Sequence, residues 1–221
     1  MLATLTLRHA QVNSDARVDS AANVTAVTIA DRRLRDRAAR RELIIATARA
    51  IAEGEGWDSV TTRRLSTEIE YSQPVLYKHF SSMEDIVEAV ALQGFSELAE
   101  TLRAARAGAS GPEKALNRVA HAYNRFAADN PILYDAMFTR ATRLRFGGTK
   151  ETPPELRAGF AELRQVVARV AGGRDVETLT EVLWAALHGL TTLARSGRLR
   201  PGRVRQRIEL LVAQFYEPVS G

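Results

Sequence analysis

The segment from residue 61 to residue 80 holds the side chains whose types and spacing best suit a chemical task. It reads TTRRLSTEIEYSQPVLYKHF. An amide, an apolar group, a phenol, a cation and an imidazole stand near its end, at Gln73, Val75, Tyr77, Lys78 and His79. Such a mixture provides hydrogen bonds to base edges, a contact for a thymine methyl group and contacts for phosphates. The segment is therefore a candidate for contacting double-stranded DNA.

Two short helices are predicted to position these groups, over residues 62–69 and 73–80, with a turn between them. This spacing is typical of a helix-turn-helix. Pro74 falls in the first turn of the second helix, where its missing N–H costs no internal hydrogen bond. The apolar contacts that hold the pair at an angle are expected from Leu65, Ile69 and Leu76. The second helix can then present its N-terminal face outward.

The first long helix is predicted from about Asp36 to Glu53. Its apolar residues recur at helical spacing, at Ile44, Ala48, Ile51 and Ala52. Gly54 and Gly56 are expected to end it. Residues 1–30 show neither a helical period nor a turn-bounded strand pattern, and we expect a flexible extension there.

Helix start and stop signals cover the rest of the chain. Three pairs have capping-box spacing, namely Ser81 with Glu84, Ser110 with Glu113, and Thr152 with Glu155. Further starts are predicted at Asn130-Pro131 and Asp175, and stops at Gly147-Gly148, Gly172-Gly173 and Gly197. These signals predict an all-α fold of about nine helices with no strand. We expect a flexible extension over 1–35, a three-helix DNA-binding domain over 36–98, and a helical ligand-binding and dimerisation domain over 99–221.

Residues 38–98 resemble the DNA-binding domain of the TetR family. The resemblance covers the amphipathic first helix, the Gly-x-Gly-Trp-Asp-Ser-Val link, the Thr-Thr-Arg opening and the QPxLYxH recognition helix. It implies that Thr61, Thr62 and Arg63 meet phosphates or a base, that Gln73 and Val75 read bases, and that Tyr77, Lys78 and His79 hold the backbone. The implied DNA-contacting set is Thr61, Thr62, Arg63, Ser72, Gln73, Pro74, Val75, Tyr77, Lys78 and His79.

Two positions depart from the pattern of that family. The turn usually carries Gly where this chain has Glu70, so either a non-glycine residue accepts left-handed torsions or the turn is built differently. A carboxylate there would also repel phosphate. The helix after Ser81 often has Lys near its start, where this chain has Met83, and Met83 receives no DNA role.

The second half resembles the regulatory domain of a TetR subgroup, through AYNRFAADNPILYDAMF and WAALHGLTTLARSGRL with its Trp-x3-His-Gly signature. Trp184 and His188 are four residues apart and so share one helix face. They either border an effector cavity or form a core pair, and helical spacing of aromatics favours the core. The same two alternatives, cavity wall or core, hold for the other ligand candidates, Tyr123, Phe126, Met137 and Phe138. They also hold for Tyr134.

The last two strong helices are predicted over residues 176–195 and 204–216. Their wide apolar faces include Leu179, Leu183, Leu187, Ile208, Leu211 and Phe215. In the family such a pair forms a four-helix dimer interface. A symmetric homodimer would place two recognition helices at the spacing of a palindromic operator.

Composition excludes several function classes. The chain has no cysteine, which removes disulfides, thiolate nucleophiles and cysteine zinc sites. No phosphate-binding Gly-rich loop and no HExxH pair is present, so we expect neither an enzyme nor a cofactor. With no transmembrane run and no secretory signal pattern, a cytoplasmic protein without a membrane partner is expected. The net charge of +5 does not by itself indicate DNA binding. The excess of positive charge lies in residues 104–221, with 18 Lys and Arg against 11 Asp and Glu, and not in the predicted DNA-binding domain.

These observations predict a regulator that binds operator DNA as a homodimer and is released by an unknown small-molecule effector. The coupling would pass through the helix after Ser81. An alternative stays open, a helical ligand- or protein-binding module whose DNA-reading head is degenerate. An Arg-rich run precedes the strongest part of the first predicted helix and consists of Arg32, Arg33, Arg35, Arg37, Arg40 and Arg41. It has two interpretations, a phosphate contact or a solvated helix start.

Overall fold

The computed structural model describes residues 12–141, 143–145 and 152–216, with side chains from residue 28 onward. The described elements are helical throughout, which confirms the predicted all-α class. The nine α-helices are α1 (Val12–Glu55), α2 (Thr62–Glu68), α3 (Gln73–Tyr77), α4 (Met83–Ala107), α5 (Pro112–Asp129), α6 (Pro131–Asp135), α7 (Pro154–Ala168), α8 (Val176–Arg195) and α9 (Val204–Ala213). A 3-10 turn, η1 (Trp57–Ser59), follows α1, and a π-helical turn, η2 (Ala136–Arg140), follows α6. No described helix is both long enough and apolar enough to span a bilayer.

The chain divides into two compact units, residues 1–44 and residues 45–221. In the first unit, the predicted helix start near Asp36 is wrong, because α1 begins at Val12. The sequence from Val12 to Glu53 contains neither Gly nor Pro, so nothing interrupts a helix there. The side chains of residues 28–43 are exposed. A helix without a buried face carries no apolar period, which is why the pattern of residues 28–35 indicates a flexible extension. The prediction for residues 1–11 lies outside the described residues.

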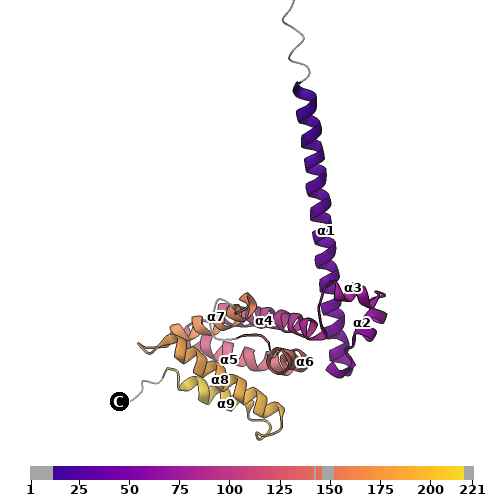
Figure 1. The fold of residues 1–221 in the computed structure, drawn as a ribbon. Coiled ribbons are helices and arrows are strands. Elements are labelled where there is room, and N and C mark those ends of the chain that lie inside the picture. The colour runs from indigo at the N-terminus through magenta and orange to yellow at the C-terminus, as the bar shows by residue number, and fades with distance from the viewer. Residues whose placement is uncertain (1–11, 142, 146–151, 217–221) are drawn as a thin grey trace, which may run out of the picture. The chain divides into compact units, whose positions relative to one another are not determined.

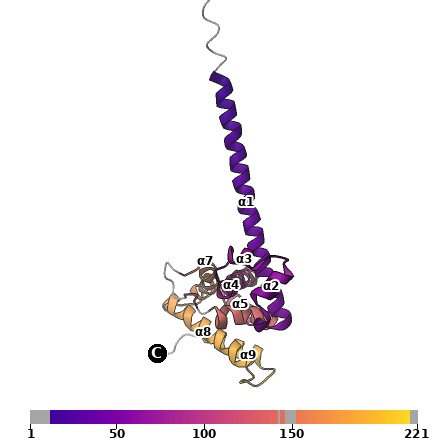
Figure 2. The ribbon, with the colours of Figure 1, turned by 45° about the vertical axis from the view of Figure 1, so that its right-hand side comes forward.

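In the second unit, α4 packs against α5, α7 and η2, while α8 and α9 lie side by side and both pack against α5 (Figures 1 and 2). Gly94 permits a close approach on one side of α4. A Cβ atom at this position would lie 2.7 Å from the Met137 sulfur and 2.9 Å from a Leu133 methyl carbon. On the other side, the buried Glu162 carboxylate of α7 accepts hydrogen bonds from Arg103 Nε at 3.1 Å and Arg106 Nε at 2.9 Å.

Helix starts agree with the predicted signals only in part. Asp175 caps α8, because its carboxylate accepts the Thr178 N–H at 2.8 Å. The cap of α4 is shifted by one residue from the prediction: Ser82 accepts the Asp85 N–H at 3.2 Å, and the Asp85 carboxylate accepts the Ser81 N–H at 2.9 Å. Ser82 is therefore the cap instead of Ser81, and the return bond from Asp85 reaches the N–H of Ser81, one residue before the cap.

The predicted cap of α5 at Ser110 is wrong, because Gly111 directly precedes the helix and no side chain caps it. Pro153, one residue after the predicted cap Thr152, directly precedes α7. Both helices instead begin with proline, at Pro112 and Pro154. Proline supplies helical φ and removes one amide that would need a cap, so the prolines mark these starts. The predicted stop at Gly197 is confirmed, because Gly197 directly follows the C-cap of α8 with a φ angle of 70°. Gly172 and Gly173 lie beyond the end of α7, with φ angles of 58° and 90°, and the predicted stop at Gly147-Gly148 lies outside the described residues.

Candidate nucleic-acid interface and effector cavity

The two short helices α2 and α3 are held together by a small apolar core. Leu65, Ile69 and Leu76 are buried, as the sequence predicts. The Thr61 hydroxyl accepts the Arg64 N–H at 3.1 Å and so caps α2. The sequence therefore builds a helix-turn-helix whose interior is apolar and whose polar residues are left on the outside.

The turn between α2 and α3 is built on Glu70. Its φ angle is +56°, and no other described non-glycine residue has a positive φ. The Tyr71 N–H donates to the Ser66 carbonyl at 3.1 Å across the turn. Of the two alternatives for this position, a non-glycine residue accepting left-handed torsions is the one observed. The Glu70 side chain is exposed beside the reading helix.

Most predicted DNA-contacting residues lie at the surface of this head. Exposed side chains belong to Thr61, Arg63, Ser72, Gln73, Pro74, Tyr77 and Lys78. Partly buried ones belong to Thr62, Val75 and His79. Tyr77 stands out because 53% of it is exposed, although its large ring could pack between the helices. The first turn of α3 thus offers an amide to solvent, and its end offers a phenol and a cation.

Arg64 differs from its neighbour Arg63 because it is held within the head. Its guanidinium lies 2.9 Å from a carboxylate oxygen of Glu55 and 2.9 Å from one of Glu68. Arg64 is therefore an exposed residue whose charge is already paired within the chain. Met83 is the partly buried first residue of α4.

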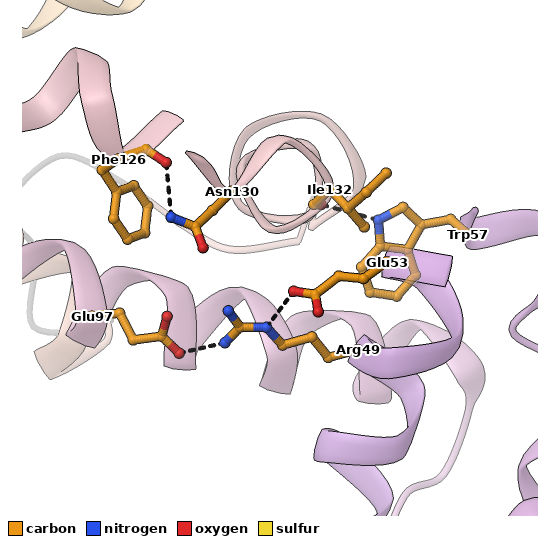
Figure 3. Close-up of polar contacts among 7 residues, drawn as sticks. All are labelled: Arg49, Glu53, Trp57, Glu97, Phe126, Asn130 and Ile132. Carbon is orange, nitrogen blue, oxygen red and sulfur yellow. Dashed lines mark hydrogen bonds and ion pairs between the residues drawn. The ribbon is translucent and has the colours of Figure 1, made fainter. Parts of the chain in front are cut away.

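Residues 49–58 make specific contacts with the α4, α6 and η2 segments. The Trp57 indole N–H donates to the Ile132 carbonyl at 3.2 Å, and Arg49 lies between Glu53 and Glu97, at 2.8 and 2.5 Å (Figure 3). The Arg140 guanidinium lies 6.0 Å from the centre of the Trp57 ring. The end of η2 therefore lies against η1, the turn that leads into the first helix of the helix-turn-helix.

A cavity of about 470 Å³ lies among α4, α5, η2, α7 and α8. Three predicted ligand candidates line it, namely Tyr123, Phe138 and Trp184. The lining also includes Phe95 and Phe160, which the sequence pattern does not distinguish from ordinary core, because both are apolar residues at helical spacing. Its size is within the range of small-molecule sites.

The other three candidates, Phe126, Met137 and His188, do not line this cavity. Phe126 and Met137 are buried in the core, and Met137 packs over Gly94. His188 lies behind the wall, with its ring centre 4.8 Å from that of Phe138. Trp184 and His188 share a helix face, as expected, but only Trp184 borders the cavity.

A chain of hydrogen bonds joins Tyr123, which lines the cavity, to His188. The Tyr123 and Tyr134 hydroxyl oxygens lie 3.0 Å apart, and Tyr134 Oη lies 2.7 Å from His188 Nδ1. Burial raises the pKa of Tyr134 to about 12 and that of Tyr123 well above its ordinary value. Both phenols therefore stay protonated at neutral pH and can donate.

The π-helical turn η2 brings Phe138 to the cavity wall. The Ala141 N–H donates to the Ala136 carbonyl at 3.0 Å, five residues back instead of four. Single π-helical turns often occur at functional sites. The same short turn carries Phe138 against the cavity and Arg140 against Trp57.

Acid should weaken the fold through His188. Burial lowers its pKa below the ordinary 6.5, so between these two values the unfolded chain binds more protons than the folded chain. The free energy of unfolding should therefore fall as pH drops below about 6.5. Urea denaturation at pH 7.5, 6.5 and 5.5 should show a shallower fall for His188→Gln. His121, whose pKa burial also lowers, remains in the variant and contributes with the same sign. An identical fall in both proteins contradicts the prediction.

The helices α8 and α9 bury one face and leave another exposed. Leu183, Leu187 and Ile208 are buried. Along α8, Val182, Ala186, Gly189 and Leu193 follow one another at steps of four and three residues, which places them on one face. We call these four residues the outer stripe. Val182 is 53% exposed, Leu193 38%, and Leu210 of α9 68%. An apolar surface of this kind commonly marks an interface.

Two family models match the chain. Residues 44–90 match the model described as bacterial regulatory proteins, tetR family. Residues 116–215 match the model described as tetracyclin repressor-like, C-terminal domain. The two matched ranges contain the helix-turn-helix and most of the elements around the cavity.

Among curated proteins, an uncharacterized HTH-type transcriptional regulator of Mycobacterium tuberculosis is 31% identical over 161 residues, which is 71% of each chain. A solved protein of unknown function from a Rhodococcus species is 25% identical, with a TM-score of 0.64 over 80% of this chain and 93% of its own. A TetR family transcriptional regulator from Thermus thermophilus shares the fold, at 20% identity and a TM-score of 0.54 over 80% of this chain and 99% of its own.

Proposed function

This chain belongs to the TetR family of transcriptional regulators, and we propose that it is a repressor that a small-molecule effector releases from a palindromic operator. The observation that carries the proposal is the joint presence, in residues 45–221, of an exposed reading helix α3 and an apolar cavity. The short segment α6–η2 contacts Trp57 of η1, the turn that precedes α2, and also borders the cavity. We assign no catalytic step and place the protein in the cytoplasm.

The proposed DNA contacts follow the exposure of the side chains. Gln73, near the start of α3, is assigned to a base edge, because its amide can both donate and accept. Lys78 and Arg63 are assigned to phosphates. The other residues that we assign to DNA contact are Thr61, Thr62, Ser72, Pro74, Val75, Tyr77 and His79.

The proposed dimer buries the outer stripe of α8 against its copy, with Leu210 of α9 beside it. Small side chains at Ala186 and Gly189 would let two α8 helices approach closely. A two-fold axis makes the same surface serve both partners and gives the two α3 helices the symmetry of a palindrome.

The proposed coupling passes through η2 as well as through α4. A ligand that displaces Phe138 would move the turn that also carries Arg140, and Arg140 contacts Trp57. Three residues after the end of η2, the Arg143 guanidinium lies 2.5 Å from a carboxylate oxygen of Asp85 and 2.6 Å from one of Glu88, both in α4. Allosteric coupling of this kind is typically about 1 to 3 kcal/mol, so an effector would weaken operator binding about 5- to 150-fold.

The test is fluorescence anisotropy of the full chain with the DNA that flanks its own gene, against a scrambled duplex, in a salt series. We expect preferential binding to the native duplex, with an affinity that falls steeply with salt. Equal affinity for both duplexes would contradict sequence-specific regulation. Binding to neither, even at low salt, would favour the alternative of a ligand- or protein-binding module with a degenerate head. The exposed Glu70 carboxylate beside α3 is the observation that keeps that alternative open.

A further inference from the structure

The charged residues of the cavity lie at its entrance. Arg157, Arg164, Glu177 and Glu181 are all exposed, and Arg164 forms an ion pair with Glu177. Two cations and two anions give this rim no net charge. The charged residues of the described lining are these four, so an ionised group deeper inside would lose its hydration without a buried counter-charge. The enclosed part of the cavity therefore favours an uncharged molecule.

The inner wall is mainly aromatic and aliphatic. Its apolar side chains include Phe95, Leu98, Leu102, Phe138, Leu156 and Phe160. Polar groups are contributed by the buried Thr152, by Tyr123 and by the indole of Trp184. Of these, Tyr123 belongs to the hydrogen-bonded chain that ends at His188.

The Tyr123 hydroxyl can make more hydrogen bonds than it makes with the described residues. A phenol hydroxyl can make three hydrogen bonds, one as donor and two as acceptor. Among the described residues, its hydrogen-bond partner is the Tyr134 hydroxyl, 3.0 Å away. Tyr123 also lines the cavity, so a molecule there can hydrogen-bond a remaining position.

The character of the remaining position depends on the direction of the chain. If His188 Nδ1 accepts from Tyr134, then Tyr123 donates to Tyr134 and keeps an acceptor position. If His188 Nδ1 carries the proton, the chain reverses and Tyr123 keeps its O–H to donate. A hydroxyl group on a ligand can fill either position, because it both donates and accepts. An ether or a carboxylate can only accept.

We propose that the effector is an uncharged, mainly aromatic or hydrocarbon molecule whose single hydroxyl group hydrogen-bonds Tyr123 Oη. This inference rests on the proposed function, because it names the class of effector that the regulatory cavity takes. It makes Tyr123 the residue that distinguishes a hydroxylated ligand from its ether or carboxylate analogue.

The test is isothermal titration calorimetry of the full chain at pH 7.5 with three probes that share one ring system. They are 2-naphthol, 2-methoxynaphthalene and 2-naphthoate. We expect 2-naphthol to bind about 3- to 10-fold more tightly than the ether, the usual effect of one neutral hydrogen bond, and 2-naphthoate to bind most weakly. Equal affinities for naphthol and ether, tightest binding of naphthoate, or binding of none of the three would overturn the proposal. This comparison uses the wild-type protein and needs no variant.

The variant Tyr123→Phe assigns the effect to one hydroxyl. We expect it to abolish the preference for 2-naphthol over the ether while changing the affinity for the ether by less than about 2-fold. Tyr71→Phe, the same substitution in the helix-turn-helix, should keep the wild-type preference. A preference that survives in Tyr123→Phe would overturn the assignment. Operator affinity is measured separately, and probe binding without any change in operator affinity would contradict the proposed repressor mechanism but leave the ligand class standing.

Discussion

Gln73→Ala should weaken binding to the native operator by about 30-fold or more and reduce the preference over scrambled DNA. An amide that reads a base typically contributes about 1 to 3 kcal/mol of discrimination, and a dimer uses it in both half-sites. The exposed amide near the start of α3 makes no contact on which the fold depends, so stability should not change. Anisotropy with both duplexes measures affinity and preference together.

Two comparisons make this result specific to base reading. Lys78→Ala should weaken binding to the native and the scrambled duplex equally. It should also lower the slope of log affinity against log salt concentration by about 2 for a dimer, because one phosphate contact is lost in each half-site. Gln165→Ala, which removes an exposed amide from α7, should change neither quantity. If Gln73→Ala keeps the full wild-type preference, the assignment of Gln73 to a base is wrong.

Local signals explain which parts of the fold could be predicted. The bounds of α8 were predicted to the residue, because Asp175 caps one end and Gly197 follows the other. Both signals, the Asp175 cap and the glycine after the last turn, act within a few residues of the helix end. The start of α1 was missed for a related reason, since periodicity reports a buried face and residues 28–43 have none. The π-helical turn η2 leaves no comparable mark in the sequence.

The cavity could be predicted only by residue type. Trp184 and His188 have the same helix face and similar sequence surroundings, yet only one borders the cavity. Which one does so depends on how α8 packs against η2 and α5, and that packing involves residues distant in sequence, such as Phe138 and Asn124, which contact His188 and Thr191 of α8. The outward side chains of α3 were easier to predict, because α3 is short and its one buried side chain, Leu76, fixes which face is outward.

Val182→Asp should convert the dimer into monomers and lower the affinity for the full palindrome by about 100-fold or more. The proposed interface would bury two carboxylates near its two-fold axis without counter-charges, and an uncompensated buried charge typically costs about 3 to 5 kcal/mol. Because Val182 is 53% exposed within one chain, the charge should be tolerated by the monomer. Light scattering after size-exclusion chromatography gives the mass, and thermal denaturation verifies the fold.

The dimer hypothesis makes a second demand on the same variant. Binding to a duplex with one half-site should be nearly unchanged, since each α3 reads its own half-site and Val182 lies on another helix. Ala104→Asp, which places the same charge at an exposed position of α4, should leave mass and operator affinity at wild-type values. A Val182→Asp protein that stays dimeric would move the interface away from the outer stripe. A monomer that keeps full palindrome affinity would mean that the two heads bind independently, which removes the basis for control through their spacing.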